Sequence, residues 1–299
     1  MPRAGREHKD RLFKFIFGNP EHKELTLSLY NALNNSHYTD PEQITFNTIE
    51  DAVYLGMHND VSFIIVNSMN LWEHQASYNP NLPVRFLIYA GSIYDKYLND
   101  NNIYRYGTVL HELPKPRCVC FYNGTDEQPE EQVLRLSDAF GDEDTKADIE
   151  VSVLMLNINY GRNKALMEEC SAMNEYAWFI EEIRENQKVM KNLDEAVDAA
   201  IDSMPDSFKL KRFLRAHKAE VKGMYLTEYD EEKERRLACE EASMIGREEG
   251  RAEGRAEANE RVATDMLREN FPLAMIEKIS RLSEEAIRKL AQSLGIAIV

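Results

Sequence analysis

The stretch NDVSFIIVNSMNLWEHQ, residues 59–75, decides the fold of this chain. Two β-prone runs flank a polar segment at 67–70, which has the composition of a hairpin turn. If the runs pair around this turn, Asp60 and Glu73 lie almost opposite one another. The stretch therefore predicts an antiparallel hairpin with two carboxylates at its open end.

The carboxylates and one polar neighbour form a candidate metal site. Side chains alternate between the faces of a strand, so Glu73 and Gln75 share one face and His74 lies on the other. Two close carboxylates are typical ligands of a hard divalent cation. The alternative is a solvated hairpin with carboxylates at its edge. Apolar residues such as Trp72 favour the metal site, because they indicate a hairpin inside a domain, where an unpaired charge is costly.

The segments around the hairpin alternate between helical and extended patterns. Residues 11–17 are apolar and aromatic, and we expect them to pack on the core. The order is a helix, three strands, a helix and two strands, which predicts an α/β fold with a mixed sheet and a crossover. The expected ranges are a helix at 20–35, one strand or two short strands at 44–55, a helix at 84–98, and strands at 117–122 and 149–158.

Only helical patterns follow residue 163, at 164–186, 193–203 and 208–228. The chain is therefore divided into four expected parts, which are a core at 1–162, a helical region at 163–245, a charged Gly-Arg-Glu repeat at 246–262 and a small helical module at 263–299.

The last two parts each leave two interpretations open. The repeat is either a solvated, fraying helix or a surface that another helix approaches closely at its glycines. The module has the spacing of a helix-turn-helix and a capping signature at Ser283. It carries few basic residues, so a packing or dimerisation module is the alternative. A homo-oligomer formed through these C-terminal helices is a further expectation.

Composition limits the partners and the compartment. The chain has 299 residues, 43% of them hydrophobic, and a formal net charge of −16, which disfavours simple affinity for nucleic acid. No run approaches the length of a membrane span, and no signal peptide is evident, so no membrane partner is expected. The four cysteines lack zinc-like spacing and are too few for a disulfide framework. We expect a reducing, cytoplasmic environment.

Several motifs along the chain carry a resemblance to a known family. On these motifs the chain resembles the recombination-promoting nuclease / putative transposase family, a bacterial branch of the PD-(D/E)XK nuclease superfamily. The resemblance covers almost the whole chain and is least distinctive in the last forty residues. The motifs are HKDRLFKFIFG at 8–18, NDVSF at 59–63, NLWEHQ at 70–75, NPNLPVR at 79–85, FYNG at 121–124, LRLSDAF at 134–140, LNINYG at 156–161 and the GREEGR tail.

The resemblance implies a restriction-endonuclease-like αβββαβ core with a mixed sheet, followed by an all-helical C-terminal region. It also implies a metal-dependent DNA endonuclease, linked to DNA recombination or mobile elements, that uses Mg²⁺ or Mn²⁺. Asp60 and Glu73 match the acidic residues of the family motif, and Gln75 stands where a lysine usually stands. The backbone carbonyl of His74 is the expected further ligand.

An additional acidic ligand sometimes comes from the first helix of such nucleases. Glu24 is the candidate at that place in this chain, with Glu21 behind it. Glu50 and Asp51 are the alternatives on the first expected strand.

A polar residue and a tyrosine, four residues apart, face the phosphate in related nucleases, and Arg85 and Tyr89 match them. Arg85 would then supply the positive charge that Gln75 lacks; its alternative is a salt bridge to a surface carboxylate. Because Gln75 departs from the motif, the rival function is a catalytically weakened nuclease fold that serves as a nucleic-acid-binding or assembly module in phage defence. The residues leave an RNA substrate open.

Overall fold

The hairpin lies inside a six-stranded mixed sheet. The computed structural model describes residues 11–47, 60–141, 147–190 and 192–296, apart from some side chains of one long helix. The β3–β4 and β4–β6 pairs are parallel, and the remaining neighbours are antiparallel. Across the sheet the strands are ordered β1 (Ile44–Phe46), β2 (Val61–Ile65), β3 (Ser68–Gln75), β4 (Lys115–Tyr122), β6 (Ser152–Asn157) and β5 (Glu131–Arg135).

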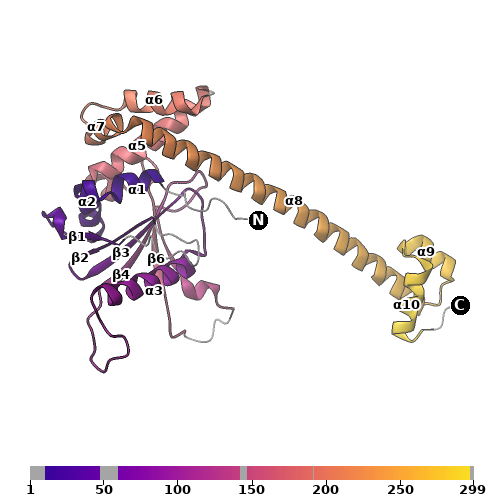
Figure 1. The fold of residues 1–299 in the computed structure, drawn as a ribbon. Coiled ribbons are helices and arrows are strands. Elements are labelled where there is room, and N and C mark those ends of the chain that lie inside the picture. The colour runs from indigo at the N-terminus through magenta and orange to yellow at the C-terminus, as the bar shows by residue number, and fades with distance from the viewer. Residues whose placement is uncertain (1–10, 48–59, 142–146, 191, 297–299) are drawn as a thin grey trace. The chain divides into compact units, whose positions relative to one another are not determined.

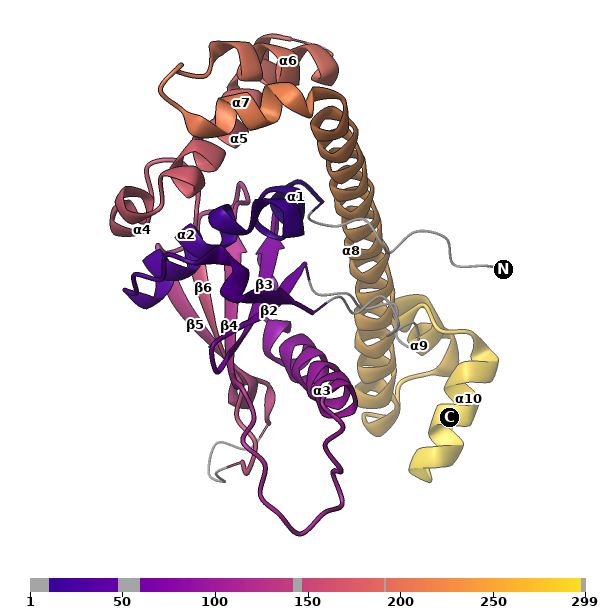
Figure 2. The same cartoon turned by 60° about the vertical axis from the view of Figure 1, so that its left-hand side comes forward.

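Helices cover both faces of this sheet. Figure 1 shows α1, α2 and α5 on one face and α3 on the other, and Figure 2 shows the same layers from a second side. The α-helices are α1 (Arg11–Phe17), α2 (Lys23–Asn34), α3 (Leu82–Asp100), α4 (Lys164–Glu169), α5 (Ser171–Val189), α6 (Leu193–Ser203), α7 (Lys209–Ala216), α8 (Lys218–Arg268), α9 (Leu273–Ser280) and α10 (Glu284–Leu294), and the 3-10 turns are η1 (Pro20–His22), η2 (Pro41–Gln43) and η3 (Leu136–Ala139).

The hairpin turn is shorter and earlier than expected. Ile65 pairs with Ser68, so Val66 and Asn67 alone form the turn, rather than residues 67–70. Val66 has a φ of 53°, a conformation that β-branched residues rarely adopt. The sequence therefore predicts that Val66 belongs to the strand rather than to the turn. The expected consequence of the pairing is nevertheless met. The register runs outward to Val61 opposite Trp72, and the next positions are 60 and 73.

Alternation along the strands produces two apolar layers. One layer contains Trp72 and Phe121 and packs against α1, α2 and α5. The other contains Leu71 and Tyr122 and packs against α3. Every apolar residue at positions 12, 13, 16 and 17 of α1 is buried, as expected for a segment that packs on the core. Glu73 has the same parity as Leu71 and therefore faces α3.

The order of α2, three strands, α3 and β4 agrees with the expected order, but two elements differ beyond it. Strand β5 was not predicted, because Glu131–Arg135 lies in an acidic stretch and buries only Leu134 among its five residues. The expected helix at 164–186 is two helices, α4 and α5, which are separated at Cys170.

The helical region shares a core with the sheet. Residues 1–232 form one compact unit and residues 233–299 a second, which differs from the expected division at 162 and 245. The apolar layer over α1 continues into α6 and α7, which lie on α5. The expected helix at 208–228 is interrupted at His217, where α7 ends, and α8 then begins at Lys218.

The second unit is a small helical module. The end of α8 packs with α9 and α10 around a core that includes Leu267, Ile276 and Ile287. Ser283 accepts a hydrogen bond from the backbone N–H of Ala286 at 3.3 Å, which confirms the expected cap of α10. Within the described residues, a Cβ added at the repeat glycines would meet nothing within 4 Å. The homo-oligomer stays a prediction.

Two further expectations concern cysteines and membranes. Cys118, Cys120 and Cys170 are free thiols. Burial raises the pKa of the Cys118 thiol to about 12, as for an inert core residue. Among the helices whose residues the structure describes, none combines the length and the apolar character that crossing a membrane requires.

One buried carboxylate joins the helical region to the layer over the sheet. Glu175 of α5 accepts a hydrogen bond from the backbone N–H of Leu210 at 2.7 Å, and this N–H belongs to the unpaired first turn of α7. Glu175→Ala should lower the free energy of unfolding by about 1.5–3 kcal/mol, as for hydrogen bonds to charged groups. Glu175→Gln should lower it less, because the amide keeps an acceptor. Urea denaturation measures both, with the exposed Glu168→Ala as the control; equal small losses in all three variants would contradict this role.

Candidate metal centre

The two carboxylates of the hairpin lie near the end of β3, where the charges of both raise the pKa of Arg85. Asp60, the residue before β2, accepts a hydrogen bond at Oδ2 from the backbone N–H of His74 at 2.7 Å. Asp60 and Glu73 are 8% and 1% exposed, so both carboxylates are withdrawn from solvent. Burial of two acids at one edge requires compensating positive or hydrogen-bonding groups.

The compensation for Glu73 comes from two neighbours on its own face of the sheet. The Gln75 side chain donates from Nε2 to Oε1 of Glu73 at 2.9 Å. The Arg85 guanidinium, from the first turns of α3, forms an ion pair with the same Oε1. The expected sharing of one face by Glu73 and Gln75 is therefore confirmed. Of the two interpretations of Arg85, the salt bridge to a surface carboxylate is wrong, because its carboxylate partner is the buried Glu73, and the supply of charge to a phosphate stays a prediction.

Tyr89 holds Arg85 in place. Its phenol oxygen accepts hydrogen bonds from Nε of Arg85 at 3.2 Å and from Nη2 at 3.0 Å. Burial, and then the charge of Glu73, raise the pKa of Tyr89 well above its ordinary value, so the phenol stays protonated. Burial lowers the pKa of Arg85, but Glu73, Tyr89 and Asp60 together outweigh it and the net shift is upward. Because Tyr89 is 2% exposed and the Arg85 side chain 29%, only Arg85 extends to solvent.

The backbone of His74 points toward Asp60. The carbonyl of Gln75 accepts a hydrogen bond from Asn123, which follows β4, so the polar backbone groups of Gln75 face that side. Adjacent residues of a strand direct these groups to opposite sides. The N–H of His74 accordingly faces Asp60, and its carbonyl lies on the same side of the strand. The carbonyl of His74 would have to lie on this side of the strand to bind a cation together with Asp60.

Oxygen donors dominate the site, and they fit Mg²⁺ or Mn²⁺. In the described part of the chain, no group of three or more His, Cys, Asp or Glu residues is placed to hold a metal ion. Asp60 and Glu73 form a pair only. Magnesium sites in nucleases and polymerases commonly use one or two carboxylates, with water and substrate phosphate completing the shell. The pair, with the His74 carbonyl, suits that mode rather than a cage made entirely of protein ligands.

The other acidic candidates lie elsewhere. The Glu24 side chain is 62% exposed and contacts the ring of His22 at 3.3 Å, rather than joining Asp60 and Glu73. Glu21 is exposed in η1. The alternatives at positions 50 and 51 fall outside the described residues. An exposed acid at the start of a helix is explained by the positive end of the helix dipole, which the sequence pattern alone does not distinguish from a ligand.

The contacts of the His74 side chain were not predicted from the sequence. The ring lies on the opposite face of the sheet from Glu73, where Nε2 is 3.2 Å from the hydroxyl of Tyr176 in α5. These two residues are 102 positions apart, and no local pattern relates them.

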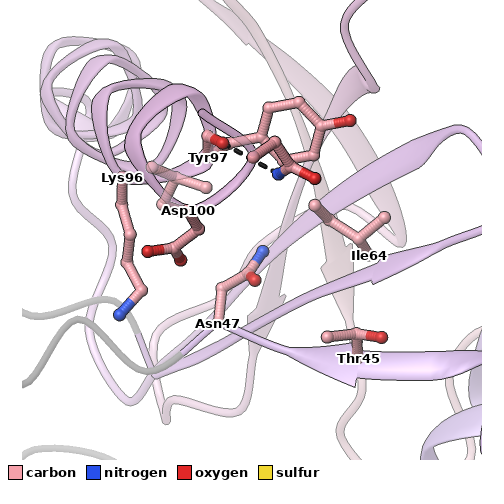
Figure 3. A pocket seen from close by; sticks show the side chains of 8 residues that line it. Thr45, Asn47, Ile64, Lys96, Tyr97 and Asp100 are labelled. Carbon is pink, nitrogen blue, oxygen red and sulfur yellow. Dashed lines mark hydrogen bonds between the residues drawn. The ribbon is translucent and has the colours of Figure 1, made fainter. Parts of the chain in front are cut away.

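The most prominent pocket does not include the site. It has a volume of about 270 Å³ and lies between the β1–β2 edge and the second half of α3, and Arg85 is not among its lining residues (Figure 3). A hydrogen bond from Nδ2 of Asn101 to the carbonyl of Tyr97, drawn in the figure, closes the helix end beside it. Its lining residues are Thr45, Asn47, Ile64, Ile93, Lys96, Tyr97, Asp100 and Asn101.

Comparison of the chain with protein-family models, with curated proteins and with solved structures gave no match. The interpretation of the site therefore depends on its geometry and on the motifs quoted above.

The Arg85–Glu73 pair gives a stability prediction. Arg85→Met should lower the free energy of unfolding by about 3 kcal/mol, near the lower limit for a broken buried pair because the guanidinium is partly exposed. Adding Glu73→Gln should restore most of the loss, because the uncompensated charge is then removed. Denaturant unfolding of the three variants completes a double-mutant cycle.

Arg105→Met is the matched control for this cycle. Arg105, which follows α3 in the chain, pairs with Asp95 of α3, and both side chains are exposed. Loss of this ion pair should therefore lower the free energy of unfolding by about 1 kcal/mol or less. If Arg85→Met were no more harmful than Arg105→Met, the pair would not be the stabilising contact described.

Proposed function

We propose that this protein is a metal-dependent DNA endonuclease that hydrolyses phosphodiester bonds and acts in DNA recombination or on mobile elements. The observation that carries the proposal is the burial of the Asp60 and Glu73 carboxylates within electrostatic reach of one guanidinium, that of Arg85. The run of α2, β1 to β3, α3 and β4 supports it, because that order is the αβββαβ order of a restriction-endonuclease-like core.

The carboxylates of Asp60 and Glu73 and the carbonyl of His74 would hold Mg²⁺ or Mn²⁺. When bound, such a cation supplies Lewis-acid polarisation of the scissile phosphate and lowers the pKa of an attacking water. Asp60 is oriented for this role before any ligand arrives, because the His74 N–H fixes its Oδ2. Preorganised ligands lose little conformational freedom on binding.

Gln75 and Arg85 together replace the lysine of the family motif. The Gln75 amide can accept and donate hydrogen bonds, so it suits the orientation of a water molecule, but it carries no charge. Arg85 supplies the charge from α3 and neutralises Glu73 before substrate binds. Its partly exposed guanidinium stands beside the carboxylate, where a phosphate oxygen of the substrate would be placed. Tyr89 keeps that guanidinium oriented.

The second candidate is a catalytically weakened nuclease fold that serves as a nucleic-acid-binding or assembly module in phage defence. One observation favours it. Both Gln75 and Arg85 engage Oε1 of Glu73, so the contacts that replace the lysine also occupy the carboxylate that would bind the cation. The net charge of −16 points in the same direction, since it weakens attraction for DNA phosphates.

Cleavage of supercoiled plasmid DNA with Mg²⁺ or Mn²⁺ tests the proposal. Asp60→Asn keeps the size of the side chain and removes its charge, and it should lower the cleavage rate by about 100-fold or more. That estimate follows because losing a group that merely supports a ligand already costs about 10–100-fold. Glu24→Gln, the same change at an exposed acid, should cleave at the wild-type rate. A wild-type protein that binds DNA without cutting it would favour the second candidate.

Gln75→Lys tests the interpretation of the third motif position. A lysine there would add the charge that normally offsets the developing phosphoanion, so plasmid cleavage should be retained or increased. The gain should disappear when Asp60→Asn is added, because the metal ligand is then missing. Loss of cleavage in the single variant, with an unchanged melting temperature, would contradict the assignment of position 75.

A further inference from the structure

His74 has contacts on both faces of the sheet. Its backbone N–H donates to Asp60 at 2.7 Å, near the end of β3 where both carboxylates lie. Its ring points to the other face, where Nε2 and the Tyr176 hydroxyl are 3.2 Å apart. The strand residue between Glu73 and Gln75 is therefore attached both to the candidate metal ligand and to α5.

The ring of His74 is enclosed by aromatic side chains. Phe13 of α1 stacks on it, with ring centroids 5.2 Å apart and planes inclined by 21°. Tyr176 meets it edge-on at 6.0 Å, and the same tyrosine contacts Phe13 and Phe17 edge-on. His74, Phe13 and Tyr176 are 6%, 0% and 1% exposed, so the ring has no room to rotate.

The histidine–tyrosine pair is polar within an apolar layer. The layer around it also contains the buried rings of Trp72, Phe121 and Phe179. A hydrogen bond in such a low-dielectric setting is strong and directional. The pair thus selects one rotamer of His74, and a fixed rotamer at a strand residue restricts the backbone that carries it.

We infer that Tyr176 and His74 form a positioning pair, through which α5 fixes the backbone of residue 74 and, with it, the Asp60 carboxylate. This inference rests on the proposed function, because it names the residue that sets the geometry of the same site. Neither side chain touches substrate or metal. Tyr176 acts on the His74 ring, the ring acts on its own backbone, and the backbone N–H holds Oδ2 of Asp60.

Tyr176→Phe tests the pair, because it removes the hydroxyl and keeps the ring. Tyr94→Phe is the matched control, since the Tyr94 hydroxyl donates to the carbonyl of Pro114 at 2.7 Å, away from the site and in the second half of α3. Both variants lose one tyrosine hydrogen bond, and both should show a similar small drop in melting temperature. Only Tyr176→Phe should affect the site.

The first readout needs no metal. In Tyr176→Phe the backbone amide resonance of residue 74 should shift, and its hydrogen exchange should accelerate, because its bond to Asp60 is loosened; in Tyr94→Phe neither should change. An unchanged amide in Tyr176→Phe would overturn the inference. If Tyr176→Phe folds poorly, the double variant H74F/Y176F replaces the pair by two apolar rings and should show the same loosened amide.

The second readout is binding of Mn²⁺ alone, followed by electron paramagnetic resonance. Tyr176→Phe should raise the dissociation constant about tenfold, within the range for groups that orient a ligand. On plasmid DNA it should lower kcat and leave KM unchanged. Equal Mn²⁺ affinity in Tyr176→Phe and Tyr94→Phe would overturn the inference. A wild type that binds no Mn²⁺ would instead contradict the proposed function, while the amide readout would still decide the positioning by residue 74.

Discussion

The contact between the buried Glu73 carboxylate and the Arg85 guanidinium constrains the whole α3 side of the sheet. A carboxylate that is 1% exposed requires a positive partner, because an isolated buried charge costs several kcal/mol. Arg85 can meet this need only if the first turns of α3 lie against the end of β3. Tyr89, one turn further along, then fixes the guanidinium from within the apolar layer. The position of α3 on the sheet and the charge balance of the site therefore depend on the same contact.

This arrangement also clarifies the departure at position 75. In the nuclease motif that the chain resembles, a lysine would bring a charge on a flexible stem from β3 itself; here the charge comes from the neighbouring helix and Gln75 contributes an amide. A guanidinium presents several donors in a fixed plane and remains charged even when partly buried. The upward shift in the pKa of Arg85 agrees with this, since Glu73, Tyr89 and Asp60 together more than offset the effect of burial. Under the proposed function, orientation of a water molecule would fall to Gln75 of β3 and compensation of charge to Arg85 of α3.

The hairpin and the placement of the pair could be predicted from the sequence, because strand alternation and turn chemistry are local properties. The turn at Val66 was not predicted, because valine prefers extended backbone and rarely adopts the positive φ that it has here. Strand β5 was missed because acidic residues hide a strand that buries only Leu134. The contact between His74 and Tyr176 could not be anticipated at all. Its two residues are brought together by packing, and no periodicity records such a relation.

Two consecutive residues of α5 contact different parts of the structure. Glu175 caps α7, and Tyr176 reaches through the apolar layer to His74. The α5 segment is consequently part of the packing of the sheet rather than an appendage to it. A boundary drawn at residue 162 would remove α5 from the layer that it forms with α1 and α2 over one face, and with it the tyrosine on His74. The sheet and α5 are therefore expected to unfold as one cooperative unit, despite their different secondary structure.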